Sequence, residues 1–121
     1  MVEQAKALTK QYSKSFLIWN FIGVANIDLG RLEEASTALE KVVELNPNYA
    51  VGFNNLSVAL QDQGNLDKAI EASKKAISLK PDYVDALYNM GNILKDQDKL
   101  EEAIMIYKKV ISLKPNYFKV Y

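Results

Sequence analysis

The side chains of this chain that could take part in chemistry are asparagines and aspartates that recur at a fixed interval. Asn55 and Asn89 are 34 residues apart, and the same interval separates Asp28, Asp62 and Asp96. An asparagine amide donates and accepts hydrogen bonds as a peptide bond does, whereas an aspartate carboxylate only accepts them and attracts cations. These side chains suit the binding of a polypeptide or of a basic ligand.

The composition excludes the usual catalytic and metal sites. The 121 residues include no histidine and no cysteine, which removes hydrolase triads, zinc motifs, thiolate nucleophiles and disulfides. Fifteen basic residues balance fifteen acidic ones, so no net charge attracts nucleic acid or an anionic membrane. No segment approaches the roughly 20 apolar residues that span a bilayer, and the charges in Met1–Lys6 argue against a signal peptide. We therefore expect a soluble protein that needs no cofactor or metal, and we predict a cytoplasmic location.

Three prolines place these side chains in a larger pattern. Pro47, Pro81 and Pro115 share the 34-residue interval, and each is followed by Asn-Tyr or Asp-Tyr. A period of this length is the signature of a solenoid, in which one helical unit is repeated. Ser13 stands one interval before Pro47, so the segment that precedes it is predicted to be the second helix of a truncated repeat. The predicted units are 1–15, 16–49, 50–83, 84–117 and the start of a fourth repeat at 118–121.

Each complete unit contains two helical patterns separated by a short turn. Gly30 and Gly64 occupy this turn in the first two units. Asp98 takes their place in the third unit, and aspartate tolerates the left-handed conformation better than most residues. The sequence predicts an all-α fold without strands, with seven helices near 2–12, 16–29, 32–45, 50–63, 66–79, 84–97 and 100–113.

Aligned columns of the three units describe how the two helices pack. A small residue lies in the middle of each first helix, Gly23, Ser57 or Gly91, and small residues let two helices approach closely. A large apolar residue precedes it by one turn, and an alanine recurs on the second helix. The predicted core therefore includes Trp19, Phe53, Leu87, Ala35, Ala69 and Ala103.

One set of positions resembles the tetratricopeptide repeat (TPR). The positions in the first unit are Trp19, Ile22, Gly23, Gly30, Ala35 and Pro47. Their counterparts extend the resemblance over residues 16–117, with Ser57, Ser73 and Asp98 as departures from the family pattern. The resemblance implies antiparallel helix pairs in a right-handed α-solenoid, whose concave wall is lined by the first helix of each pair. It also implies a scaffold that binds other proteins and is no enzyme.

The resemblance further implies a peptide-binding site on the concave wall. Its residues would be Leu17, Asn20, Phe21, Val24, Asn54, Asn55, Val58, Asp62, Tyr88, Asn89 and Asn92. Asn55 and Asn89 are similar to the asparagine row of O-linked N-acetylglucosamine transferases, which holds the backbone of an extended polypeptide. We expect both side chains to face solvent in the free protein. Phe21 interrupts the row, and repeat ancestry alone also explains the asparagines.

Two further features of this wall have alternative interpretations. Leu17, Phe21 and Val24 either receive an apolar side chain of a ligand or pack against preceding helices. The recurring aspartates either form an acidic row for a basic ligand, or pair with lysine or arginine of the adjacent repeat, or reflect repeat ancestry alone.

One specific role is rejected. Chaperone-binding members of the family hold a C-terminal carboxylate in a clamp whose positions fall here on Asn20, Val24, Asn55, Asp85 and Asn89. Only Asn55 fits the clamp, and Asp85 would repel the carboxylate.

Two classes of function follow. The first is a protein-interaction module that binds an extended peptide or a partner protein in the concave groove. The second is the substrate-recruiting segment of a larger glycosyltransferase or sulfotransferase, whose catalytic domain is not in this chain. Because the apolar Phe118 and Tyr121 have no following unit to cover them, we also expect homo-oligomers that form through the uncapped ends.

Overall fold

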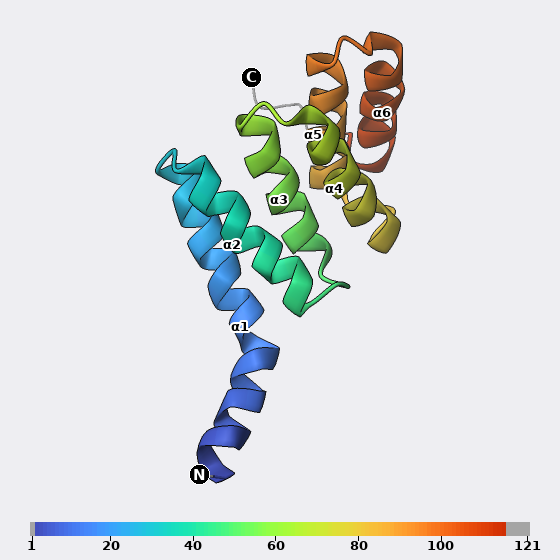
Figure 1. Ribbon diagram of the computed structural model, residues 1–121. Coiled ribbons are helices and arrows are strands. Elements are labelled where there is room, and N and C mark those ends of the chain that lie inside the picture. The colour runs from blue at the N-terminus through green and yellow to red at the C-terminus, as the bar shows by residue number, and fades with distance from the viewer. Residues whose placement is uncertain (1, 116–121) are drawn as a thin grey trace.

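A computed structural model describes the backbone of residues 2–115 and the side chains of residues 15–115. This part of the chain forms six α-helices and no strand (Figure 1). The helices are α1 (Val2–Asp28), α2 (Leu32–Leu45), α3 (Ala50–Asp62), α4 (Leu66–Leu79), α5 (Val84–Asp96) and α6 (Leu100–Leu113). They pack as the pairs α1 with α2, α3 with α4 and α5 with α6. The predicted all-α solenoid of antiparallel helix pairs is confirmed.

The N-terminal helix differs from the sequence-based prediction. We expected separate helices at 2–12 and 16–29, but α1 is one helix of 27 residues. Ser13 occupies the position of the recurring proline, and unlike proline it keeps its N–H and leaves the preceding residue free to be helical. Nothing at this point therefore ends the helix. Figure 1 shows the first half of α1 extending away from the other helices, so it does not fold back as the second helix of a preceding pair.

The turn inside each pair has the predicted left-handed residue. Gly30 has φ 76°, Gly64 has φ 82°, and Asp98, the non-glycine residue at this place, has φ 64°. In each turn the following residue donates its backbone N–H to a carbonyl five residues earlier, at 2.8 to 2.9 Å, as in a Schellman motif. Aspartate in this conformation costs the third turn about 1 kcal/mol relative to glycine.

Close contact between the two helices of a pair depends on a small residue. A Cβ atom placed on Gly23 would lie 2.5 Å from Cγ of Leu39. One placed on Gly91 would lie 2.6 Å from Cε1 of Tyr107. In the second pair the corresponding residues are Ser57 and Ser73, both fully buried. The serine in place of glycine is thus accommodated because the side chain that faces it is also small.

Contact between successive pairs follows a second size rule. A Cβ atom on Gly52 of α3 would lie 2.7 Å from Cγ1 of Val42 of α2, and at the next junction both residues, Ala76 and Ala86, are small and buried. The residue of α1 that corresponds to Gly52 is Ile18, which is 58% exposed. A helix that approached α1 as α2 approaches α3 would collide with this side chain.

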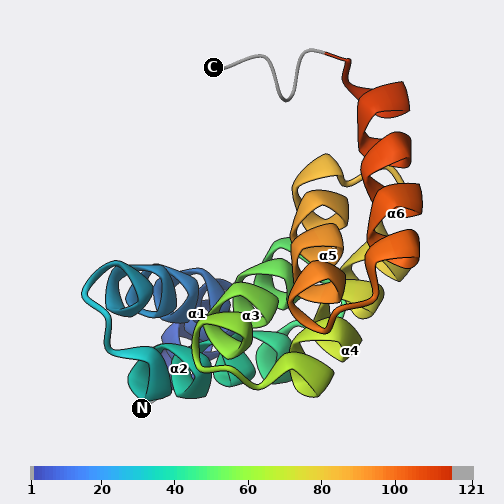
Figure 2. The ribbon, with the colours of Figure 1, turned by 90° about the horizontal axis from the view of Figure 1, so that it is seen from above.

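These contacts give the solenoid its curvature. Figure 2 shows α1, α3 and α5 side by side on the inner side of the curve, with α2, α4 and α6 on the outer side. Hydrogen bonds between side chains of α1 and α3 and of α3 and α5 confirm that the first helices are neighbours. Among the described residues, no helix is both long and apolar enough to cross a membrane.

The size rule within a pair is testable in the third unit. Gly91→Ala should lower the free energy of unfolding by about 1 to 3 kcal/mol, because the new methyl group collides with the Tyr107 ring. This loss outweighs the gain of about 1 kcal/mol in helix propensity. In a Tyr107→Ser background, which copies the facing residue of the second unit, the same change should be neutral or stabilising. Urea unfolding of the wild type, the two single variants and the double variant measures the coupling between residues 91 and 107. Equal effects of Gly91→Ala in both backgrounds would contradict the size rule.

Candidate functional site

The inner face of the solenoid is the surface formed by α1, α3 and α5, and asparagines join these helices. Asn55 Nδ2 of α3 donates a hydrogen bond to Asn20 Oδ1 of α1 at 3.0 Å. Asn89 Nδ2 of α5 donates to Asn54 Oδ1 of α3 at 2.9 Å. We call these four residues the amide ladder. Because both bonds connect residues 35 apart, each joins one repeat to the next.

This arrangement corrects the expectation that Asn55 and Asn89 face solvent. Both side chains are half-buried, and their amides bond within the protein. Asn54 is more deeply placed, with only 6% of its surface exposed. An amide group can form more than one hydrogen bond on each side, so the ladder uses part of the capacity of Asn55 and Asn89 and leaves the rest.

Tyr83, which precedes α5, extends the contacts of the ladder. It forms a side-chain hydrogen bond with Asn54. Burial raises the pKa of the Tyr83 phenol above its ordinary value, and the negative charge of Asp85 raises it further, while the bond to Asn54 acts in the opposite direction. The neutral phenol is therefore the form that the fold favours.

At the α1 end, the inner face is apolar. Phe21 stands where the other two repeats have Asn55 and Asn89, and it is 73% exposed. Leu17 and Val51 are also exposed, and Val24 and Val58 are half-buried. We call these residues the apolar patch: Leu17, Phe21, Val24, Val51 and Val58. In the described part of the chain no preceding helix covers Leu17 and Phe21.

The recurring aspartates lie at the C-terminal ends of the three first helices and are all exposed. Gln61 Nε2 donates a hydrogen bond to Asp96 Oδ2 at 3.1 Å. The residue of the first repeat that corresponds to Gln61 is Ile27, which cannot donate such a bond to Asp62. Pairing with the adjacent repeat thus accounts for Asp96, through glutamine and not through lysine or arginine, but it does not account for Asp62.

At the α5 end, two predicted wall residues contact α6. The Tyr107 hydroxyl donates to Asn92 Oδ1, and the rings of Tyr88 and Tyr107 lie with their centroids 6.1 Å apart. Burial, then the nearby Tyr88 and the charge of Asp96, raise the pKa of Tyr107. Tyr88 and Asn92 are half-buried as a result.

Phe118 and Tyr121, predicted to mediate self-association, lie outside the described residues, so that role stays a prediction.

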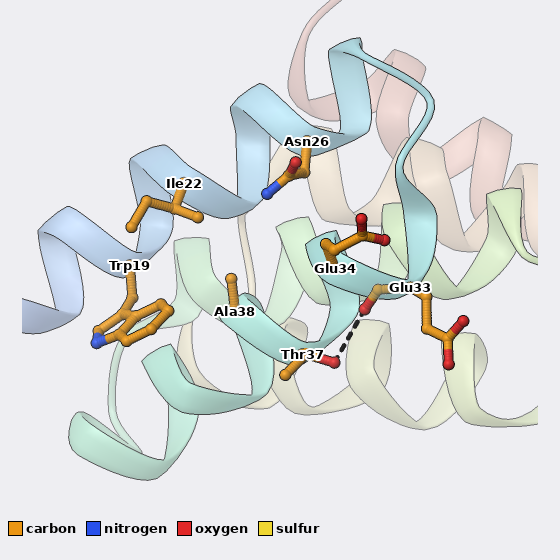
Figure 3. A pocket seen from close by; sticks show the side chains of 7 residues that line it. All are labelled: Trp19, Ile22, Asn26, Glu33, Glu34, Thr37 and Ala38. Carbon is orange, nitrogen blue, oxygen red and sulfur yellow. Dashed lines mark hydrogen bonds between the residues drawn. The ribbon is translucent and has the colours of Figure 1, made fainter.

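A cavity that the sequence did not reveal lies between α1 and α2 (Figure 3). It measures about 580 Å³ and is lined by Trp19, Ile22, Asn26, Glu33, Glu34, Thr37 and Ala38. The Thr37 hydroxyl turns to the Glu33 carbonyl at 2.9 Å. Six of the seven corresponding residues of the second pair line a smaller cavity of about 290 Å³, together with Glu40 of the preceding α2 and Lys75. The cavity thus belongs to the packing within the first two pairs and not to the inner face.

No group of histidine, cysteine, aspartate or glutamate side chains in the described part of the chain is arranged to hold a metal ion. The inner face presents three features that could bind a ligand. They are the amides that join the repeats, the apolar patch at the α1 end and the row of carboxylates at the C-terminal ends of the first helices. A ligand on this face would be held by hydrogen bonds, apolar contact or charge.

Comparisons with known proteins cover most of the chain. A family profile described as "TPR repeat" matches residues 23–64 and 59–98, and one described as "Tetratricopeptide repeat" matches residues 84–117. No curated protein sequence matches significantly.

Several solved structures have the same fold. The first TPR domain of Spaghetti (RPAP3), bound to the HSP90 peptide SRMEEVD, is 26% identical with a TM-score of 0.85, over 88% of this chain and 85% of that one. The TPR domain of Arabidopsis OM64 is 17% identical with a TM-score of 0.85, over 88% of each chain. MamA is 29% identical with a TM-score of 0.78, over 86% of this chain and 61% of its own.

The amide ladder should contribute unequally to stability along its length. Asn89→Ala leaves the carbonyl of the buried Asn54 without its partner and should cost about 1 to 3 kcal/mol. Asn55→Ala leaves only the half-buried Asn20 oxygen, which water can reach, so its cost should be below about 1 kcal/mol. Urea unfolding of both variants gives the order. A larger loss for Asn55→Ala, or no loss for either, would contradict the ladder.

The tyrosine pKa values predict alkaline destabilisation. The pKa of Tyr83 and of Tyr107 is raised in the folded protein, whereas an unfolded tyrosine ionises near pH 10. The two neutral phenols stabilise the folded protein fully below about pH 10. This stabilisation is lost as the pH rises through their pKa in the folded protein, because the tyrosines of the unfolded chain release their protons first. The free energy of unfolding should fall as the pH is raised from about 8 to 11, and it should fall less steeply in Tyr107→Phe than in the wild type. An unchanged slope in that variant would contradict the assignment.

Proposed function

Because the chain belongs to the tetratricopeptide repeat family and exposes an apolar patch beside an amide ladder, we propose that it is a protein-interaction module that binds an extended peptide on its inner face. The peptide is a segment of a partner protein. The observation that carries the proposal is Phe21, a large aromatic side chain that is 73% exposed on this face. Exposed apolar patches of this kind are typical of binding surfaces.

The peptide-bound relative supports this role. The RPAP3 domain has the same fold over most of its length and holds a peptide. The match extends across all three helix pairs of this chain, so the same surfaces exist here. The side chains on these surfaces differ, however, and the ligand of RPAP3 is not assumed to be the ligand of this chain.

The proposed contacts divide between the two features of the face. The apolar patch receives one large apolar side chain, whose burial contributes about 1.5 to 3 kcal/mol. Asn55 and Asn89 use their remaining donor and acceptor capacity on the peptide backbone, at about 0.5 to 1.5 kcal/mol for each bond. The ladder holds both amides in place before the peptide arrives, which reduces the entropy lost on binding.

The proposal describes a scaffold and not a catalyst. The absence of catalytic activity, the cytoplasmic location and self-association through the chain ends stay predictions. Recruitment of substrates to a larger glycosyltransferase or sulfotransferase would use the same inner face, with the catalytic domain elsewhere.

The test compares two equally exposed side chains on different faces. A peptide selected from a library against the protein is titrated against Phe21→Ser and against Met105→Ser. Met105 lies on α6 and is 71% exposed, so it is a matched control. Phe21→Ser should weaken binding roughly tenfold or more, because about 1.4 kcal/mol is worth a factor of ten. Met105→Ser should leave the affinity unchanged.

The double change Asn55→Ala, Asn89→Ala should also weaken binding several-fold. Since this variant is expected to be less stable, binding is measured well below its melting temperature. Equal affinities for the wild type and Phe21→Ser would place the peptide on another surface and overturn the proposal.

A further inference from the structure

From residue 16 onward, the charges of the inner face are mostly negative. Between residues 16 and 96, the three first helices carry four aspartates, Asp28, Asp62, Asp85 and Asp96, and a single basic residue, Lys95. All five side chains are exposed. The chain as a whole has no net charge, so the negative charge of this face is a local feature and not a consequence of composition.

Neighbouring repeats do not supply opposite charges in the register of Asp62 and Asp96. Asp96 accepts its bond from the neutral Gln61, and the residue in the same register beside Asp62 is the apolar Ile27. Elsewhere a neighbouring repeat does bring basic groups to an acidic one, since Glu40 of α2 lines one cavity with Lys68 and Lys75 of α4. The inner face lacks this pattern around Asp28 and Asp62, whose exposed carboxylates are available to a ligand.

The row also has a spacing that a peptide can match. Asp28, Asp62 and Asp96 occupy the same position on three helices that lie side by side, and packed helices are about 8 to 10 Å apart. An extended chain advances about 3.3 Å per residue. A peptide that crosses the helices therefore meets one carboxylate for about every three of its residues.

We propose that the ligand of the inner face is an extended cationic segment, with one large apolar residue for the apolar patch and lysine or arginine at about every third position. This inference rests on the proposed function and names its ligand class. It also distinguishes the chain from the RPAP3 domain. The peptide SRMEEVD bound to that domain has three acidic residues and one basic residue, and an inner face of like charge would repel it.

The first experiment uses three synthetic peptides with blocked ends and a common leucine anchor in a glycine and serine background. Every third residue is arginine in the first peptide, glutamine in the second and glutamate in the third. Titration by fluorescence anisotropy at low salt should give the tightest binding for the arginine peptide, weaker binding for the glutamine peptide and at least a tenfold loss for the glutamate peptide. The differences should shrink as salt is raised, because the charges are exposed.

The second experiment changes the protein. The double variant Asp28→Asn, Asp62→Asn removes two carboxylates from the inner face. Its control, Glu33→Gln, Glu34→Gln, removes two exposed carboxylates from α2 and alters the net charge equally. The first variant should bind the arginine peptide about three- to tenfold more weakly, whereas the control and the glutamine peptide should show little change.

The outcomes separate this inference from the function on which it rests. Equal binding of all three peptides, with Phe21→Ser still weakening each, would keep the peptide site and overturn the cationic ligand. Equal losses in the aspartate variant and its control would also overturn it, because net charge alone would then explain the preference. Binding that does not respond to Phe21→Ser would overturn both the peptide site and its ligand class.

Discussion

The close approach of the two helices in each pair is the constraint on which the rest of the structure depends. Gly23 and Gly91 have no room for a Cβ atom beside Leu39 and Tyr107, so the helix axes lie as near to one another as side chains permit. Gly52 likewise has no room for a Cβ atom beside Val42, and this contact sets the distance between successive pairs. With both distances fixed, α1, α3 and α5 become direct neighbours, and asparagine side chains are long enough to bridge them.

The amide ladder therefore has two roles that compete for the same groups. It joins the repeats, and it is the polar part of the proposed peptide site. A ladder asparagine that bonds a peptide backbone must do so with the donor or acceptor that its neighbour does not use. The first repeat avoids this competition, because Phe21 replaces asparagine there and offers apolar surface instead. The inner face thus changes along the solenoid from apolar contact to hydrogen bonding.

The sequence predicted most of the fold, because the 34-residue period, the prolines and the turn residues are local signals. It failed at α1, where Ser13 does not break the helix and no local signal marks a boundary. It also failed for the exposure of Asn55 and Asn89. Their partners are 35 residues away, one period plus one position, and the pattern within a single helix cannot show a contact of this kind. A search for amide pairs at that separation would have found the ladder.

The short reach of these contacts has a consequence for how the chain folds. The side-chain hydrogen bonds that join different repeats span 30 to 35 residues, so each unit depends on its immediate neighbours and the relative contact order is low. Folding can then start at any junction and spread in both directions. The α3–α4 pair has a neighbour on both sides, whereas α6 leaves Ile104 and Ile111 exposed. Amide protons should consequently exchange most slowly in the middle of the array and progressively faster toward its ends.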